Sequence, residues 1–317
     1  MSRPAVALIA LSCTLFAGLV LAGCGSSGRS SSPSCSDAAV ASSATSHDSL
    51  ESLAGHSPIA VVPGTEDFQP GRNRVSFLII DGQSREISTP TACVWVATGL
   101  KDVPFERAVA RSEPVGVAGG AAAPVGSIYV THVNLPQPGK YWLLAVPAGS
   151  SKPIGAFANL VVPAKRVGAP RVGDRAIPSR TPTLASTGGK LAAVTTATHP
   201  DPRLYRLSVA QAMASHVPFV VTFATPRFCT SRTCGPVVDV VDAVSRKLAA
   251  TPVRFIHVEI YKGNDPAKGF NPWVKEWNLP TEPFTFVVDR NGVIRAKLEG
   301  AFSVSELEST VRALLLR

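Results

Sequence analysis

One segment in the last third of the chain constrains its fold more than any other. A mostly apolar run, Phe219 to Phe223, predicts a buried strand, and Cys229 and Cys234 follow it with four residues between them. Gly235-Pro236 then opens a predicted helix. A thiol at such a junction meets unpaired backbone N–H groups and the positive end of the helix dipole, and both favour the thiolate. We therefore expect thiol chemistry at this segment.

The N-terminal segment predicts export. Arg3 is the only charged residue before an apolar run from Ala5 to Leu21, a pattern typical of a secretory signal. The residues Leu21-Ala22-Gly23-Cys24 resemble a bacterial lipobox, which implies cleavage after a signal peptide of residues 1–23 and lipid attachment at Cys24. An uncleaved membrane anchor is the alternative, although a span needs about 20 apolar residues.

Residues 24–67 are expected to be a flexible tether, because Ser and Gly dominate Ser26 to Ser36. A tether behind a lipidated cysteine would hold folded domains off the membrane. The sequence therefore predicts a cell-envelope protein that is lipid-anchored to the outer face of the plasma membrane.

The cysteines of the exported chain are even in number. Cys13 lies in the predicted signal and Cys24 in the lipobox, which leaves four others. An even count in an exported chain indicates disulfides, although the sequence does not determine their connectivity. The four are Cys35, Cys93, Cys229 and Cys234. The short separation of the last two favours pairing them together, which leaves Cys35 for Cys93.

The basic charge does not point to nucleic acid. The formal net charge of +9 falls to +8 without Arg3, and the excess cations are spread over loops and linkers without a nucleic-acid motif. Export also argues against a nucleic-acid partner. Solubility and attraction to an anionic envelope surface explain the charge better. The cations include Arg72, Arg74, Lys165, Arg166, Arg171, Arg175 and Arg180.

Two domains are expected after the tether. Residues 68–162 hold short runs rich in β-branched and aromatic side chains, broken by Pro and Gly, which predict a β-sandwich loosely similar to an immunoglobulin-like fold. Nothing in it looks catalytic. Residues 163–202 are rich in Pro and Arg and predict a linker. Residues 203–317 predict the order helix, strand, helix, strand, helix, strand, strand, helix.

This order, with cysteines after the first strand and Pro283 before the third, resembles the thioredoxin fold. The segment from Pro283 to Gly292 is similar to envelope thioredoxins of the TlpA type, in which the proline is cis and lies against the reactive disulfide. The resemblance implies an α/β domain that exchanges disulfides with exported protein thiols or disulfides and needs no dissociable cofactor. Its catalytic residues would be Cys234, Cys229 and Pro283.

The cysteine spacing departs from the family's Cys-Gly-Pro-Cys, and two alignments compete. Either Cys229 takes the place of the first cysteine, or Cys234-Gly235-Pro236-Val237 does so and Cys229 resolves from the loop. Residues five apart on a helix lie about 140° apart around its axis, so both thiols cannot share one helical face. We therefore expect Cys229 in a loop and Cys234 as the thiol of lower pKa.

Two further departures concern acids. The family's buried acid would fall near Thr222, which cannot act as a base at neutral pH, and Glu282 places a carboxylate near the thiols, where it opposes thiolate formation. Two alternatives to exchange therefore stay open. One is a structural disulfide in a non-catalytic interaction module. The other resembles the Sco copper chaperones, with Cys229, Cys234 and His257 as Cu(I) ligands, although a mid-strand histidine is more often structural.

Overall fold

The computed structural model of the chain describes residues 48–54, 59–149 and 155–316. The predicted signal peptide, Cys24 and Cys35 lie outside this part. Within the described residues, no helix is long and apolar enough to span a membrane.

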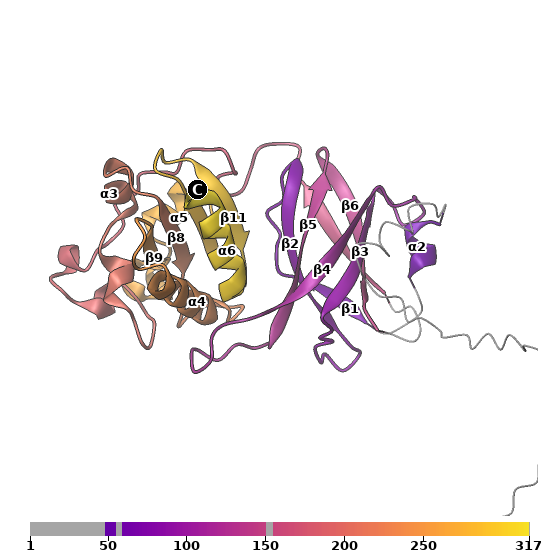
Figure 1. Ribbon diagram of the computed structural model, residues 1–317, viewed down its shortest axis with the longest axis horizontal. Helices are drawn as coiled ribbons and strands as arrows, with labels where there is room; N and C mark the ends of the chain where they lie inside the picture. The colour runs from indigo at the N-terminus through magenta and orange to yellow at the C-terminus, as the bar shows by residue number, and fades with distance from the viewer. Residues whose placement is uncertain (1–47, 55–58, 150–154, 317) are drawn as a thin grey trace, which may run out of the picture. The chain divides into compact units, whose positions relative to one another are not determined.

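The first half of the described chain forms one seven-stranded antiparallel sheet, drawn from indigo to magenta in Figure 1. A one-turn helix, α2 (Leu50–Leu53), precedes it, and the strand order is β1-β2-β5-β4-β3-β6-β7. The strands are β1 (Ala60–Pro63), β2 (Gly71–Ile80), β3 (Thr91–Ala97), β4 (Glu106–Pro114), β5 (Ser127–Leu135), β6 (Gly139–Pro147) and β7 (Ala156–Val162).

Strand β4 joins two halves of this sheet. Its residues Glu106 to Arg111 pair with β3, and Arg111 to Pro114 pair with β5. The halves β1-β2-β5 and β3-β6-β7 share one apolar core that includes Phe77, Val96 and Leu143. The edge strands β1 and β7 also contact each other, so the sheet nearly closes into a barrel. The sequence predicted a sandwich of two sheets; the structure instead has one continuous sheet, because β4 is long enough to pair on both sides.

The first helix and strand lie earlier in the chain than the sequence indicated. Both α2 and β1 lie in the segment expected to be a tether, where β1 pairs with β2 and Leu50 is fully buried beside Cys93. The boundary expected at residue 68 is therefore too late. The sequence does not predict β1 because its only β-branched residues, Val61 and Val62, follow a long Ser-rich stretch.

The second half of the chain builds a four-stranded sheet of order β11-β10-β8-β9, with β8 and β9 parallel and the other pairs antiparallel. It follows the element order expected from the sequence. Apolar clusters lie on both faces, which explains why every residue of β8 is buried. The elements are α3 (Val209–Ala214), β8 (Phe219–Ala224), α4 (Cys234–Lys247), β9 (Arg254–Glu259), α5 (Pro272–Glu276), β10 (Phe284–Val288), β11 (Ile294–Glu299) and α6 (Val304–Leu315), with 3-10 turns η5 (Lys262–Asn264) and η6 (Pro266–Lys268).

The segment expected to be a linker, residues 163–202, packs onto this second sheet. Ala169 and Ala176 are buried in one core cluster and Val194 in the other, and Arg175 forms an isolated bridge with Val293. Without periodicity the sequence could not show this burial. The segment and its continuation contain the 3-10 turns η2 (Ala185–Thr187), η3 (Leu191–Ala193) and η4 (Pro202–Tyr205).

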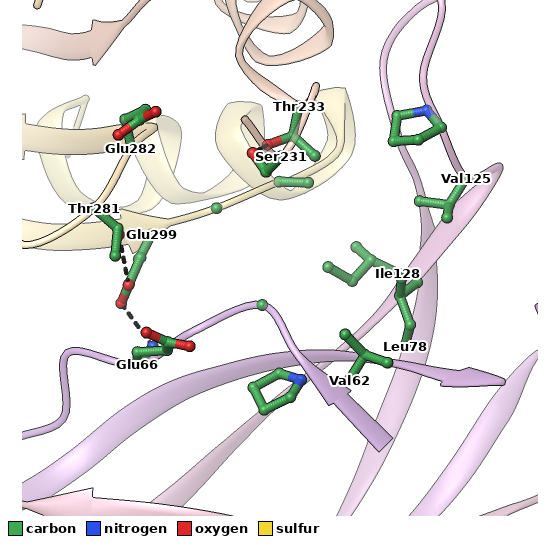
Figure 2. Close-up of a pocket in the computed structure, with 15 residues that line it drawn as sticks. Val62, Glu66, Leu78, Val125, Ile128, Ser231, Thr233, Thr281, Glu282 and Glu299 are labelled. Atoms are coloured by element: carbon green, nitrogen blue, oxygen red, sulfur yellow. Dashed lines mark hydrogen bonds between the residues drawn. The ribbon is translucent and has the colours of Figure 1, made fainter. Parts of the chain in front are cut away.

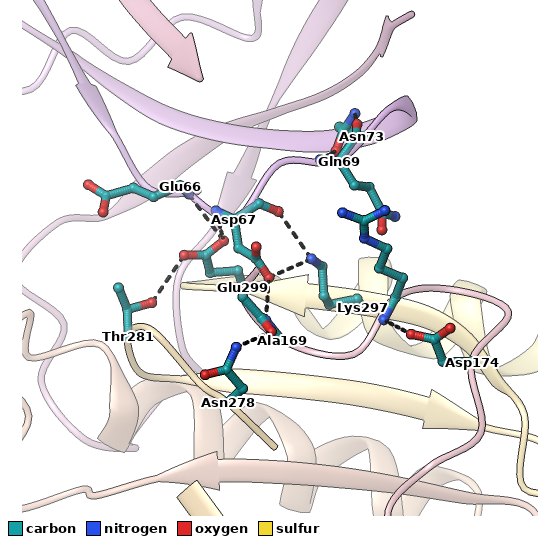
Figure 3. A network of polar contacts seen from close by, with 12 residues as sticks. Glu66, Asp67, Gln69, Asn73, Ala169, Asp174, Asn278, Thr281, Lys297 and Glu299 are labelled. Atoms are coloured by element: carbon teal, nitrogen blue, oxygen red, sulfur yellow. Dashed lines mark hydrogen bonds and ion pairs between the residues drawn. The ribbon is translucent and has the colours of Figure 1, made fainter. Parts of the chain in front are cut away.

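Buried polar contacts join the first sheet to β11 (Figure 3). The ammonium of Lys297 lies 2.9 Å from the Asp67 carboxylate, with only 10% and 8% of the two side chains exposed. Glu299 accepts hydrogen bonds from the backbone N–H groups of Glu66 and Asp67 and from the Thr281 hydroxyl. This carboxylate therefore ties the first sheet to the segment that leads into Pro283.

Candidate dithiol site

The two sulfurs of the cysteine segment lie side by side. Cys229 is in the loop between β8 and α4, and Cys234 is the first residue of α4. The N–H of Cys234 donates to the Cys229 sulfur at 3.3 Å, and the Ser231 hydroxyl lies 3.2 Å from the same sulfur. Cys234 is fully buried and Cys229 is 8% exposed, and neither is in a disulfide.

These contacts separate the two thiols in acidity. Hydrogen bonding from the Cys234 thiol, then from Ser231 and the backbone N–H groups of Cys234 and Thr233, lowers the pKa of Cys229 to about 5. Burial, followed by the hydrogen bond to Cys229 and its charge, raises the pKa of Cys234. The arrangement therefore holds a thiolate at Cys229 and keeps the proton on Cys234.

This order of acidity is the reverse of the one expected from the sequence. The expectation assigned the helix N-terminal amides to the sulfur of Cys234, the residue that begins the helix. In the structure the loop folds back, with Arg232 in the left-handed region (φ 58) and its N–H bonded to the Cys229 carbonyl. The N–H of Cys234 therefore donates to the Cys229 sulfur, while the Cys234 side chain is fully buried.

Pro283 lies directly before β10, which is paired to β8, the strand that leads to the cysteines. The Glu282–Pro283 peptide bond is cis, the isomer that the resemblance to TlpA-type thioredoxins implied. Burial, and then the charge of Cys229, raises the pKa of Glu282. The negative charge of Cys229 thus disfavours ionisation of the Glu282 carboxyl, and the charge of Glu282 in turn contributes to raising the pKa of Cys234.

The histidine of the copper alternative has a structural setting. His257 is buried in β9, with Nδ1 2.8 Å from the Tyr205 hydroxyl and Nε2 3.2 Å from the Ala224 carbonyl oxygen. Burial lowers its pKa to about 4. In the described parts of the chain, no group of three or more His, Cys, Asp or Glu side chains is placed to hold a metal ion. The structure therefore does not bring His257 together with Cys229 and Cys234 as a ligand set.

A buried acid is present, but sequence analysis did not identify it. Thr222, at the position considered, is buried and bonds to the Thr285 hydroxyl. Glu259, at the end of β9, is 4% exposed, and burial raises its pKa. Its Oε1 accepts from the Thr196 N–H, while Oε2 and the nearby Thr225 hydroxyl are buried without a hydrogen-bond partner among the described residues. The sequence feature that could have identified this site is Glu259 itself, the one acidic residue in the mostly apolar run that forms β9.

A cavity of about 320 Å³ lies beside the cysteine loop (Figure 2). Ser231 and Thr233 of that loop line it, together with Thr281 and Glu282, which precede the proline. Its other wall comes from the first sheet and the β4–β5 connection. That connection also reaches α4, where the Ala121 N–H donates to Asp239 at 2.5 Å.

No protein-family model matches the chain, and a search of curated proteins finds no similar sequence. A thioredoxin-like domain therefore stays a prediction from the residues and elements described above. Cys93 is disulfide-bonded, and Cys35, the partner that the sequence favours, lies outside the described residues.

Proposed function

We propose that the chain is a thioredoxin-like thiol–disulfide oxidoreductase of the cell envelope, anchored by lipid at Cys24. The observation that supports this best is the asymmetry of the two sulfurs. Cys229 has its pKa lowered to about 5 and keeps a small exposed surface, whereas Cys234 is protonated and fully buried behind it. A purely structural bridge requires no such difference.

The first step is attack by the Cys229 thiolate on a disulfide of an exported protein. A bond forms between the Cys229 sulfur and one substrate sulfur, the substrate S–S bond breaks, and the second substrate sulfur leaves as a thiolate that takes up a proton. The lowered pKa of Cys229 ensures that the attacking thiolate is present at neutral pH.

The second step releases the substrate. Cys234 loses its proton and attacks the Cys229 sulfur, the mixed disulfide breaks, and the remaining substrate sulfur leaves with its electron pair and takes up the proton that Cys234 has lost. The substrate gains two electrons and two protons, while the enzyme becomes the Cys229–Cys234 disulfide. The same steps in reverse oxidise a substrate dithiol. Pro283, directly before β10, would orient the substrate backbone beside Cys229.

Trapping of the mixed disulfide tests this assignment. We expect the Cys234→Ser variant to form a stable mixed disulfide at Cys229 with an oxidised protein substrate such as insulin, detected by intact mass. The matched Cys229→Ser variant should form none, because its remaining thiol is buried and protonated. Equal trapping by both variants, or by neither, would contradict the proposal.

A further inference from the structure

The cavity beside the cysteine loop has two chemically different sides. Figure 2 shows Val62, Leu78, Val125 and Ile128 along one side, all of them from the first sheet and its loops. The opposite side carries the acidic side chains Glu66, Glu282 and Glu299. The two halves of the chain therefore build this cavity together.

The cavity touches the reactive centre through the cysteine loop. Ser231, which lines it, also lies 3.2 Å from the sulfur of Cys229. A group held in the cavity is therefore adjacent to the hydrogen-bonding partners of the thiolate. A volume of about 320 Å³ is at the low end of the range for ligand pockets, roughly 300–1,000 Å³, which suits one or two side chains.

The charge of the cavity selects among possible occupants. Of the described residues that line it, none is Lys, Arg or His. Glu299 already accepts three hydrogen bonds, but Glu66 is exposed and Glu282 is half-buried, so both remain available to a ligand. Carboxylates favour a cation and disfavour small anionic disulfides.

We propose that this cavity is a substrate-selecting site that receives an apolar side chain of an extended polypeptide, with a Lys or Arg next to it, while a neighbouring cysteine of that polypeptide reaches Cys229. The inference depends on the proposed function and adds a substrate class to it. It also gives the first sheet a role, because that sheet supplies the apolar wall.

The test measures reaction rates of the reduced full chain with peptide disulfides. In each peptide one cysteine is linked to a small thiol, and a Leu or a Ser stands one to four residues away, next to a Lys or a Glu. At the spacing that reacts fastest, we expect the Leu peptide to react about tenfold or more faster than the Ser peptide, which corresponds to the free energy of burying one aliphatic side chain. Lys should be preferred over Glu by about two- to fivefold, as for a partly exposed ion pair.

Two matched pairs of variants assign the preferences. Val62→Gln should reduce the Leu preference, whereas Val161→Gln, the same change at an exposed site on β7, should not. Glu66→Lys should weaken the Lys preference, whereas Glu51→Lys on α2 should not. The two control variants, Val161→Gln and Glu51→Lys, should react like the unaltered chain with bis(2-hydroxyethyl) disulfide, which has neither charge nor side chain.

The possible outcomes distinguish failure of this inference from failure of the proposed function on which it rests. Normal reaction with bis(2-hydroxyethyl) disulfide but no peptide preference overturns the cavity assignment and leaves the oxidoreductase intact. A chain dimer in sedimentation that Val62→Gln abolishes also overturns it, because the occupant is then a second copy. Failure of Cys229 to react with the neutral disulfide overturns the proposed function itself.

Discussion

The N–H of Cys234 lies 3.3 Å from the Cys229 sulfur, while the Cys234 sulfur is fully buried. Two identical thiols thus acquire opposite tendencies, because hydrogen bonds from the Cys234 thiol, Ser231 and the backbone stabilise the Cys229 thiolate, whereas burial keeps the proton on Cys234. The residue that begins a helix directs its N–H away from its own side chain and toward the preceding loop. Sequence spacing places both cysteines at the helix N-terminus but does not determine which sulfur receives the amides.

Alkylation should reveal this difference. We expect the iodoacetamide reaction of Cys229 to reach half its maximal rate near pH 5, because its thiolate is stabilised down to that pKa. Ser231→Ala removes one hydrogen bond to the sulfur and should move the midpoint to higher pH. Thr230→Ala, an exposed neighbour, is the control. A midpoint near 8.5, the value of an ordinary cysteine, would contradict the assignment.

Glu259 makes a separate prediction about stability. Burial raises its pKa in the folded chain, so its contribution to stability is present at pH values below its unfolded pKa and is lost as pH rises through the folded value. Glu259→Gln keeps the acceptor for Thr196 and carries no charge. Urea unfolding should therefore show the unaltered chain losing stability relative to this variant as pH rises above about 4.5. Parallel pH dependences would contradict the burial of an ionisable carboxyl.

At the scale of elements, Gly300 connects β11 to α6 and needs its special geometry. Its φ is +71, and an added Cβ would collide with the Gly64 carbonyl oxygen near β1. Gly300→Ala should lower the free energy of unfolding by about 2–4 kcal/mol, from left-handed strain together with the collision. Gly119→Ala has φ +73 but no atom within 4 Å, so it should cost only about 1–2 kcal/mol. Equal losses of unfolding free energy for the two variants would contradict a close contact between Gly300 and the Gly64 carbonyl oxygen.

Elements with a strong pattern were predictable from sequence. The stripe Val237, Val240, Val241 and Val244 is buried in α4, and the continuous apolar run before the cysteines is buried on both faces as β8. These patterns act locally, within a turn or a strand. Strand β1 and the packing of residues 163–202 were not predictable, because their burial depends on partners far along the chain. The Glu259 site depends in the same way on Thr196, which the segment expected to be a linker supplies.

At the scale of the whole molecule, the buried pair Lys297 and Asp67 joins the two sheets. Lys297→Met leaves the Asp67 carboxylate buried without its cation, and should cost about 3–5 kcal/mol. Lys247→Met removes an ammonium at the same 2.9 Å distance from Glu308, but 53% exposed, and should cost about 1 kcal/mol or less. Adding Asp67→Asn should recover part of the first loss in urea unfolding. Equal costs for the two lysines would contradict a buried joint.

A redox titration of the full chain tests the central claim most directly. The protein is equilibrated across glutathione and dithiothreitol potentials, its free thiols are alkylated, and the fraction of the Cys229–Cys234 disulfide is measured by mass. We expect a reversible two-electron transition between about −270 and −120 mV, the span of known exchange catalysts. A Cys229–Cys234 disulfide whose midpoint potential lies below about −300 mV would contradict thiol–disulfide exchange, as would two sulfurs that never form a disulfide.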